Sequence, residues 1–156
     1  MAGVVFIDSS VLLRVLNVPG NTSKEEHELD VAQFSAYVAA GDQLVLPLTT
    51  VIETGNAIAR VSGGDRHRCI VTFVTFLRGS VANQRPWIAS GLASTSALLS
   101  RMLDDGTIHL VDLMDSGVGT GDAAIIAEVA DLRERVPSAT PIVIWTHDMG
   151  LKAYSG

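Results

Sequence analysis

The residues VVFIDSS at positions 4–10 decide the fold of this chain. Four apolar residues, most of them β-branched, run without interruption into Asp8 and two serines. A short, continuously apolar run of this kind is typical of a strand that is buried on both faces, as in a parallel sheet. Ser9 or Ser10 can then cap a helix that continues to about Leu16. The stretch therefore predicts a buried strand that ends at Asp8 and is followed at once by a helix.

Two more short apolar runs, at residues 44–46 and 142–145, and the mostly apolar run at residues 108–111, which contains His109, follow. Each is predicted to be a strand. The stretches between them show apolar residues at helical spacing, bounded by capping residues, glycines and prolines. The predicted helices cover about residues 22–41, 49–63, 66–77, 88–103 and 122–136, with a last helical turn near residues 151–152. Strands that alternate with helices predict a parallel sheet with helices on both faces. We therefore expect one α/β domain over residues 1–156.

The composition is that of a compact globular protein. Hydrophobic residues make up 47% of the 156 residues and charged residues 18%, which excludes a disordered chain. No apolar run approaches the roughly 20 residues that a membrane span needs, and the first residues lack the basic leader of a signal peptide. Cys69 is the single cysteine, so neither an intramolecular disulfide nor a cysteine zinc site is expected. We expect a cytoplasmic protein with no membrane contact.

The charge is unevenly distributed along the chain. The formal net charge is −6, but residues 54–101 hold six arginines and one acid, which gives this segment +5 and the remainder −11. A basic surface of this kind can bind a phosphate backbone, and it can equally be ordinary solvated helix surface. Among the acids, Glu25, Glu26, Glu28 and Asp30 are predicted to form a polar helix face.

Four other acids are expected at one edge of the predicted sheet. Asp8 ends the first strand, Glu53 lies in the first turn of the helix after the second, Asp122 opens the helix after the third, and Asp148 follows the fourth. The carboxyl ends of parallel strands meet at the same edge, where open α/β sheets bind their ligands. Each acid alone could cap a helix or face solvent, but four crowded carboxylates repel one another unless a cation binds. Oxygen ligands without cysteine favour Mg²⁺ or Mn²⁺ over zinc.

Four short sequence blocks carry these acids: VFIDSSVLL at residues 5–13, TTVIE at 49–53, GTGDAAIIA at 119–127 and IWTHD at 144–148. In this order they resemble the PIN domain, the ribonuclease domain of VapC-type toxins and related nucleases. The resemblance spans nearly the whole chain. It implies a three-layer α/β/α fold with a central parallel sheet of four to five strands, and it puts Asp8, Glu53, Asp122 and Asp148 at the metal-ligand positions. Thr146 matches a polar residue that supports the site.

The function that the resemblance implies is hydrolysis of RNA phosphodiester bonds with bound Mg²⁺ or Mn²⁺, which leaves a 5′-phosphate and a 3′-hydroxyl. Asp8, Asp122 and Asp148 would be ligands, direct or through water, and Glu53 would hold a second ion or orient the attacking water. Thr146 would fix a carboxylate or a water. The resemblance also implies a toxin with an antitoxin protein as its partner, and a homodimer. Two alternatives stay open: a PIN nuclease that processes RNA or cuts DNA without an antitoxin, and a binding module for nucleic acid or protein without catalysis.

Two other interpretations fail in detail. The glycine-rich stretch at residues 117–122 precedes a predicted helix, as in dinucleotide-binding folds, but Asp122 stands where the third glycine of that motif belongs. A haloacid-dehalogenase-like phosphatase would need a second acid two residues after Asp8, and Ser10 stands there. His147 lies beside Asp148 and is predicted to be structural.

Overall fold

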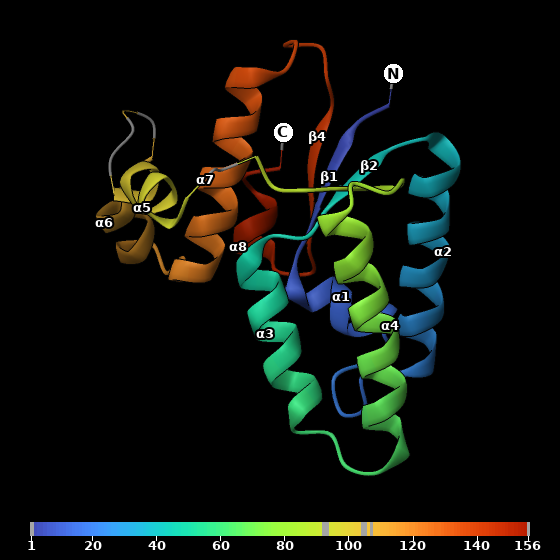
Figure 1. Cartoon of the computed structure of the whole chain (residues 1–156). Coiled ribbons are helices and arrows are strands. Elements are labelled where there is room, and N and C mark those ends of the chain that lie inside the picture. Colours follow the sequence, from blue (N-terminus) through green and yellow to red (C-terminus); the bar gives the residue numbers. More distant parts are fainter. Residues whose placement is uncertain (1, 92–93, 104–105, 107, 156) are drawn as a thin grey trace.

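The structure, a computed structural model, describes residues 2–91, 94–103, 106 and 108–155. Within these ranges the chain forms four strands and eight helices (Figure 1). The strands are β1 (Val4–Ile7), β2 (Gln43–Val45), β3 (Trp87–Ile88) and β4 (Ile142–Trp145). The helices are α1 (Ser9–Val15), α2 (Lys24–Ala40), α3 (Leu48–Ala59), α4 (Gly64–Val81), α5 (Thr95–Leu103), α6 (Leu110–Asp115), α7 (Thr120–Arg135) and α8 (Met149–Lys152).

The strands form one parallel sheet in the order β3-β2-β1-β4. β1 lies inside the sheet, where Val4 pairs with Gln43 of β2 on one side and with Ile142 of β4 on the other. All residues of β1 are buried, as its unbroken apolar run predicts. The predicted fold class, an α/β fold with a central parallel sheet, is confirmed. Because the strands are parallel, the segments that follow them leave from one edge of the sheet.

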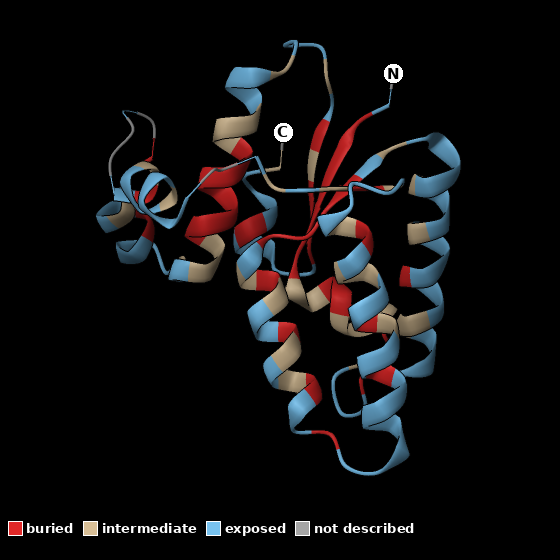
Figure 2. Ribbon diagram, viewed as in Figure 1, coloured by how far each residue is buried: buried red, intermediate tan, exposed pale blue. Residues whose placement is uncertain are grey.

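Helices cover both faces of this sheet (Figure 1). Val4 and Phe6 of β1 belong to a core that is shared with α5, α6, α7 and α8. Val5 and Ile7 belong to a second core, shared with α1, α3 and α4. Figure 2 shows the buried residues gathered in the strands and along the helix faces that turn toward them. Because successive side chains of β1 point to opposite faces of the sheet, each face has its own core. The sheet is therefore the central layer, with a layer of helices on each side.

The third predicted strand, at residues 108–111, is wrong. Helix α6 begins at Leu110, and the side chain of Val111 is 71% exposed. A four-residue, mostly apolar run cannot by itself distinguish a strand from the start of a helix. Ile108 and Leu113 decide the matter, because they are the residues of this segment that are buried in the core with α7.

The structure contains one strand that the sequence does not predict. This strand, β3, overlaps the start of the segment predicted to be helical over residues 88–103. Trp87 pairs with Leu44 of β2, and only the part from Thr95 onward is helical, as α5; residues 92–93 lie outside the described residues. The ring of Trp87 lies 5.8 Å from that of Phe34 in α2 and 4.9 Å from that of Phe76 in α4. A strand of two residues is too short to show an alternation of buried and exposed side chains in the sequence. We infer that the packing of Trp87 against α2 and α4 holds this segment in the sheet.

The other predicted helices are confirmed, with ends that shift by a few residues. Ser23 caps α2 and exchanges hydrogen bonds of 3.2 and 2.8 Å with Glu26, which forms a capping box. Gly41 ends the helix at φ 81°, a left-handed conformation that suits glycine. The cap of α1 is Asp8, where the sequence suggested Ser9 or Ser10. In the described part of the chain, no helix combines the length and the apolarity needed to cross a membrane.

The contact between α4 and β3 can be tested by adding one methyl group. A Cβ atom at Gly79 of α4 would lie 2.5 Å from Cδ1 of Trp87, whose ring is held between α2 and α4. Alanine is favoured over glycine in a helix by about 1 kcal/mol, whereas overpacking costs about 1–3 kcal/mol. We expect Gly79→Ala to lower the free energy of unfolding in urea by up to about 2 kcal/mol.

Gly64→Ala is the matched control, because a Cβ at Gly64 meets no described atom within 4 Å. This variant should be as stable as the wild type or slightly more stable. A Gly79→Ala protein that gains stability would contradict the close packing of Trp87 on α4.

Candidate active site at the carboxyl edge of the sheet

Asp8 lies where β1 ends and is only 5% exposed. Its Oδ2 accepts hydrogen bonds from Ser10 Oγ at 2.6 Å and from Thr146 Oγ1 at 2.8 Å, with a longer one from Ser10 N at 3.4 Å. Its backbone N–H donates to Trp145 O at 3.1 Å, which continues the pairing of β1 with β4. A buried carboxylate is tolerated when it is hydrogen-bonded, and here the donors come from the starts of two neighbouring segments.

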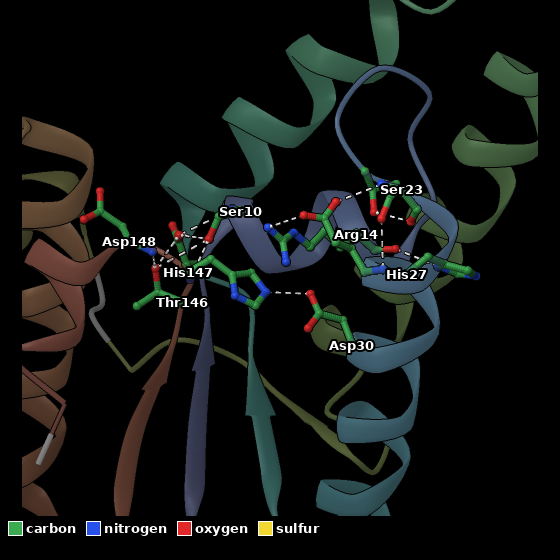
Figure 3. Close-up of polar contacts among 11 residues, drawn as sticks. Ser10, Arg14, Ser23, His27, Asp30, Thr146, His147 and Asp148 are labelled. Carbon is green, nitrogen blue, oxygen red and sulfur yellow. Dashed lines mark hydrogen bonds and ion pairs between the residues drawn. The ribbon is translucent and has the colours of Figure 1, made fainter.

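Thr146 joins the end of β4 to the end of β1. It is 6% exposed, donates to Asp8 and accepts from the backbone N–H of Asp148 at 2.9 Å. Asp148 itself is exposed and caps α8, since its Oδ1 accepts from Gly150 N at 2.8 Å. One buried hydroxyl therefore fixes the relative position of two predicted site residues (Figure 3).

Glu53 reaches the same edge from α3. Thr50, in the first turn of α3, donates a buried hydrogen bond of 2.8 Å to Ile7 O at the end of β1. Glu53 lies one turn farther along than predicted, and its Oε2 accepts from Ser9 Oγ at 2.5 Å. Its Oε1 lies close to the start of α7, where a Cβ added at Gly121 would be 2.8 Å away. Glu53 is thus held between the beginnings of α1 and α7.

Asp122 lies at the same edge as the other acids, but the element that precedes its helix differs from the prediction. It lies in the first turn of α7, but the element before α7 is helix α6 and not a strand. Burial, followed by the negative charges of Asp8, Asp148 and Glu53, raises the pKa of Asp122 from its ordinary value of 3.8 to about 6. The four predicted acids therefore lie close enough to repel one another, although only three of them follow strands.

No cationic side chain in the described part of the chain neutralises the carboxylates of this cluster. Across the described ranges, none of the four forms an ion pair with a lysine, arginine or histidine. Asp8, Glu53 and Asp148 each use one oxygen in the side-chain hydrogen bonds given above, and their second oxygens accept none from described residues. The site presents negative charge and unshared oxygen ligands to the edge of the sheet.

The arrangement fits a hard divalent cation that keeps part of its water shell. Among the described side chains, no three His, Cys, Asp or Glu groups converge tightly enough to enclose an ion by themselves. Mg²⁺ is usually bound by one or two carboxylates and several waters rather than by a complete protein cage. The oxygen-only ligands and the raised pKa of Asp122 are therefore compatible with Mg²⁺ or Mn²⁺.

Comparison with known proteins gives no family for this chain. No family model, no curated protein and no solved structure matches it.

His147 and Asp30 form a pair that sequence reasoning missed. His147 Nε2 lies 2.7 Å from Asp30 Oδ2 in α2 (Figure 3), and Asp30 is buried. The prediction of Asp30 as part of a solvated helix face is wrong. The signal was present in the spacing: Asp30 precedes the partly buried Phe34 and Tyr37 by four and seven residues, which puts it on the apolar side of the helix.

The six arginines of residues 54–101 do not form one open basic surface. Arg68 donates hydrogen bonds of 3.0 and 2.8 Å to backbone carbonyls at the end of α1, and Arg66 donates to a carbonyl just after α3. Arg101 of α5 is paired with two acids of α7 at 2.8 and 3.5 Å. The other three are exposed. Three of the six arginines therefore bind neighbouring segments of the chain.

An apolar groove borders Glu53. It has a volume of about 350 Å³ and lies between α3, α5 and α7. Ile52, Leu98 and Leu99 contribute to its walls, and Glu53 is the one charged residue among its described lining residues. Ile52 and Leu99 are 53% and 51% exposed. The edge that carries the acids thus continues directly into an apolar surface.

The hydroxyl of Thr146 can be removed with little change in shape. Thr146→Val takes one donor from Asp8 and leaves the N–H of Asp148 without its acceptor. Because a buried polar group without a partner costs about 1–3 kcal/mol, we expect a loss of that size in the free energy of unfolding in urea. Thr146→Ser keeps the hydroxyl and should recover most of the loss. A Thr146→Val protein as stable as the wild type would show that these hydrogen bonds do not contribute to stability.

The raised pKa of Asp122 predicts a specific pH dependence in metal-free buffer. Between its ordinary value of 3.8 and its folded value of about 6, the folded chain binds more protons at Asp122 than the unfolded chain does. Stability therefore falls as the pH rises through this window. Because Asp122 is partly exposed, solvent screening reduces the effect to about 1 kcal/mol. Asp122→Asn should remove this slope and be more stable than the wild type at neutral pH.

Urea unfolding with EDTA at several pH values measures this difference. Asp115→Asn, at an exposed acid of α6, is the matched control and should keep the slope of the wild type. An Asp122→Asn protein with the same slope as the wild type would contradict the raised pKa of Asp122.

Proposed function

We propose that this chain is a nuclease that hydrolyses phosphodiester bonds of RNA with the help of Mg²⁺ or Mn²⁺. The observation that carries the proposal is the crowding of four carboxylates, from four separate segments, without a cationic partner among the described residues. Repulsion of this kind destabilises the folded chain unless a cation binds. A cluster with a purely structural role would gain more from arginine or lysine partners than from a fourth acid.

The resemblance to the PIN domain supports nucleic acid as the substrate. The blocks that carry it, around Asp8, Glu53, Asp122 and Asp148, are the ones whose acids interact in the folded chain. A chance match of four short blocks would not require that their acids meet at one edge of a parallel sheet. The sheet order and the layers on both faces are also compatible with such a domain.

The residues have distinct roles in this proposal. A bound Mg²⁺ or Mn²⁺ would withdraw negative charge from the phosphate and lower the pKa of water. Asp8, Asp122 and Asp148 would hold the ion directly or through water. Thr146 keeps the carboxylate of Asp8 in one orientation through its 2.8 Å hydrogen bond, as residues behind a metal ligand commonly do. Glu53, whose Oε2 is held by Ser9, would orient the attacking water with its other oxygen.

In the proposed reaction, water attacks phosphorus directly, and no covalent intermediate forms on the protein. The oxygen of water forms a bond to phosphorus while the bond from phosphorus to the 3′-oxygen breaks. The proton released by the water passes, through solvent or a carboxylate, to the leaving 3′-oxygen. The products are a 5′-phosphate and a 3′-hydroxyl.

The groove beside Glu53 supports a polymeric substrate. A strand whose phosphate lies at the acids must continue past them, and the groove between α3, α5 and α7 begins at Glu53. Its apolar walls suit the flat faces of unpaired bases, which proteins commonly bind against apolar and aromatic side chains. A single-stranded region of RNA therefore fits this edge better than a continuous duplex.

Cleavage of a mixed pool of labelled RNAs tests the proposal. Single-stranded RNA, structured RNA and single-stranded DNA are incubated with Mg²⁺, Mn²⁺ or EDTA. We expect metal-dependent cutting of RNA that falls at least about 100-fold in Asp8→Asn, because Asp8 is the most enclosed of the proposed ligands. Asp115→Asn serves as the matched control and should cut like the wild type.

The outcomes separate the alternatives. Metal-dependent cutting confined to the DNA would replace the ribonuclease with a DNA nuclease. Cutting that survives in EDTA, or equally in Asp8→Asn, would show that another protein in the preparation is responsible. A wild type that cuts nothing and whose melting temperature does not respond to Mn²⁺ would overturn the proposal and favour a binding module.

A further inference from the structure

Asp30 is an unusual residue for the surface helix that carries it. Within α2, every residue of which is described, Asp30 alone is buried. The apolar residues Leu29, Val31 and Val38 of the same helix are 70%, 38% and 41% exposed. Acidic side chains are seldom buried unless they are paired, so the position calls for a partner.

That partner is the segment that carries the candidate site. Asp30 Oδ2 accepts from His147 Nε2 at 2.7 Å, and His147 lies between Thr146 and Asp148 in the sequence. The backbone N–H of His147 donates to Ser10 Oγ at 3.1 Å. His147 is therefore held at two points, by α2 through its ring and by α1 through its backbone.

A continuous series of hydrogen bonds leads from α2 to the first acid (Figure 3). Asp30 contacts His147, the N–H of His147 contacts Ser10, and Ser10 Oγ donates to Asp8 at 2.6 Å. Thr146, one residue before His147, donates to the same oxygen of Asp8. The pair thus lies behind the acids, where it touches the residues that orient them.

The pair is not needed to attach α2 to the rest of the chain. Glu26 forms an ion pair with Arg14 of α1 at 3.0 Å, and His27 Nδ1 lies 2.7 Å from the carbonyl of the same arginine. Phe34 stacks on Phe76 of α4 with ring centroids 5.7 Å apart. The side chain of His147 is 32% exposed, and ion pairs that are partly open to solvent contribute little to stability, so the pair at Asp30 contributes geometry more than stability.

We propose that Asp30 and His147 are a positioning pair that holds the segment of Thr146 and Asp148 in the arrangement needed to bind the divalent cation. This inference rests on the proposed function. Neither residue touches the ion or the substrate. The pair acts through the backbone of residues 146–148, and its loss weakens the binding of the ion by letting this segment move.

Mn²⁺ affinity, measured by titration calorimetry on the full chain without RNA, provides the test. We expect Asp30→Ala and His147→Ala each to weaken Mn²⁺ binding about 10-fold, the lower end of what residues behind a metal ligand contribute. The double variant should be no worse than either single variant, because both remove the same interaction.

Glu26→Ala is the matched control. It breaks the neighbouring ion pair between α2 and α1 and the hydrogen bond from Ser23 N in the capping box, but it leaves the partner of His147 in place. A merely structural role would make Glu26→Ala weaken Mn²⁺ binding as much as Asp30→Ala does, and this result would overturn the inference. Unchanged Mn²⁺ affinity in Asp30→Ala, with the wild type binding normally, would overturn it as well.

Amide hydrogen exchange in the metal-free chain separates this inference from the proposed function. Exchange at residues 147–151 should accelerate in Asp30→Ala and stay unchanged in Glu26→Ala. A wild type that binds no Mn²⁺ would overturn the metal site and, with it, the role of the pair toward the cation. If the wild type binds Mn²⁺ but exchange is unaffected by Asp30→Ala, only the positioning role is wrong.

Discussion

The carboxylate of Asp8 is buried at the end of a strand that has neighbours on both sides, and the arrangement of the candidate site follows from this burial. Such a group must be hydrogen-bonded inside the protein, since only a small part of it is open to water. Ser10 and Thr146 supply the bonds, and each belongs to a segment that leaves a strand at the same edge. Satisfying one buried charge therefore fixes the start of α1 and the segment after β4. The position of Asp148 is a consequence, because its N–H binds the hydroxyl that serves Asp8.

Helix α7 adds a further charge to this edge and is kept there by its core contacts. Residues 123–129 are all buried, and burying an isoleucine or valine side chain stabilises a fold by about 1.5–3 kcal/mol. The several large side chains of this stretch outweigh the cost of keeping Asp122 ionised, which arises from its burial and from the neighbouring charges and amounts to about 1 kcal/mol after screening. The helix cannot move its first turn away without losing that burial. The raised pKa of Asp122 is thus a cost that packing of α7 offsets.

The parts of this arrangement that follow from local pattern could be predicted from the sequence. The unbroken apolar run of β1 and the position of Asp8 directly after it are local features, and so are the caps of α2. Glu53 and Asp148 could be placed because they follow strands. Asp122 was expected at the right edge for a partly wrong reason, since the strand thought to precede α7 is the beginning of α6.

What the sequence could not provide depends on contacts between distant residues. β3 exists because Trp87 packs against Phe34 of α2, which is far from it in the chain, and against Phe76 of α4, and two residues carry no period of their own. The sequence places Asp30 on a polar helix face, because acids precede it in the sequence. Its burial depends on His147, which lies more than a hundred residues away. Both errors concern residues whose partners, rather than their own chemistry, determine where they lie.

The distribution of basic residues limits how a phosphate backbone can approach this edge. Arg66, Arg68 and Arg101 lie in the segment of +5 charge, but their guanidinium groups are bound to carbonyls and carboxylates of neighbouring segments. Among the described residues that line the groove beside the acids, Glu53 is the one charged residue. A polyanion therefore meets net negative charge at the proposed site, and Coulomb repulsion opposes its binding. Under the proposed function the cation has two tasks: it activates the reaction, and it reverses the local charge that would otherwise keep the RNA away. Binding of the ion and binding of the RNA are then coupled, each favouring the other by the same factor.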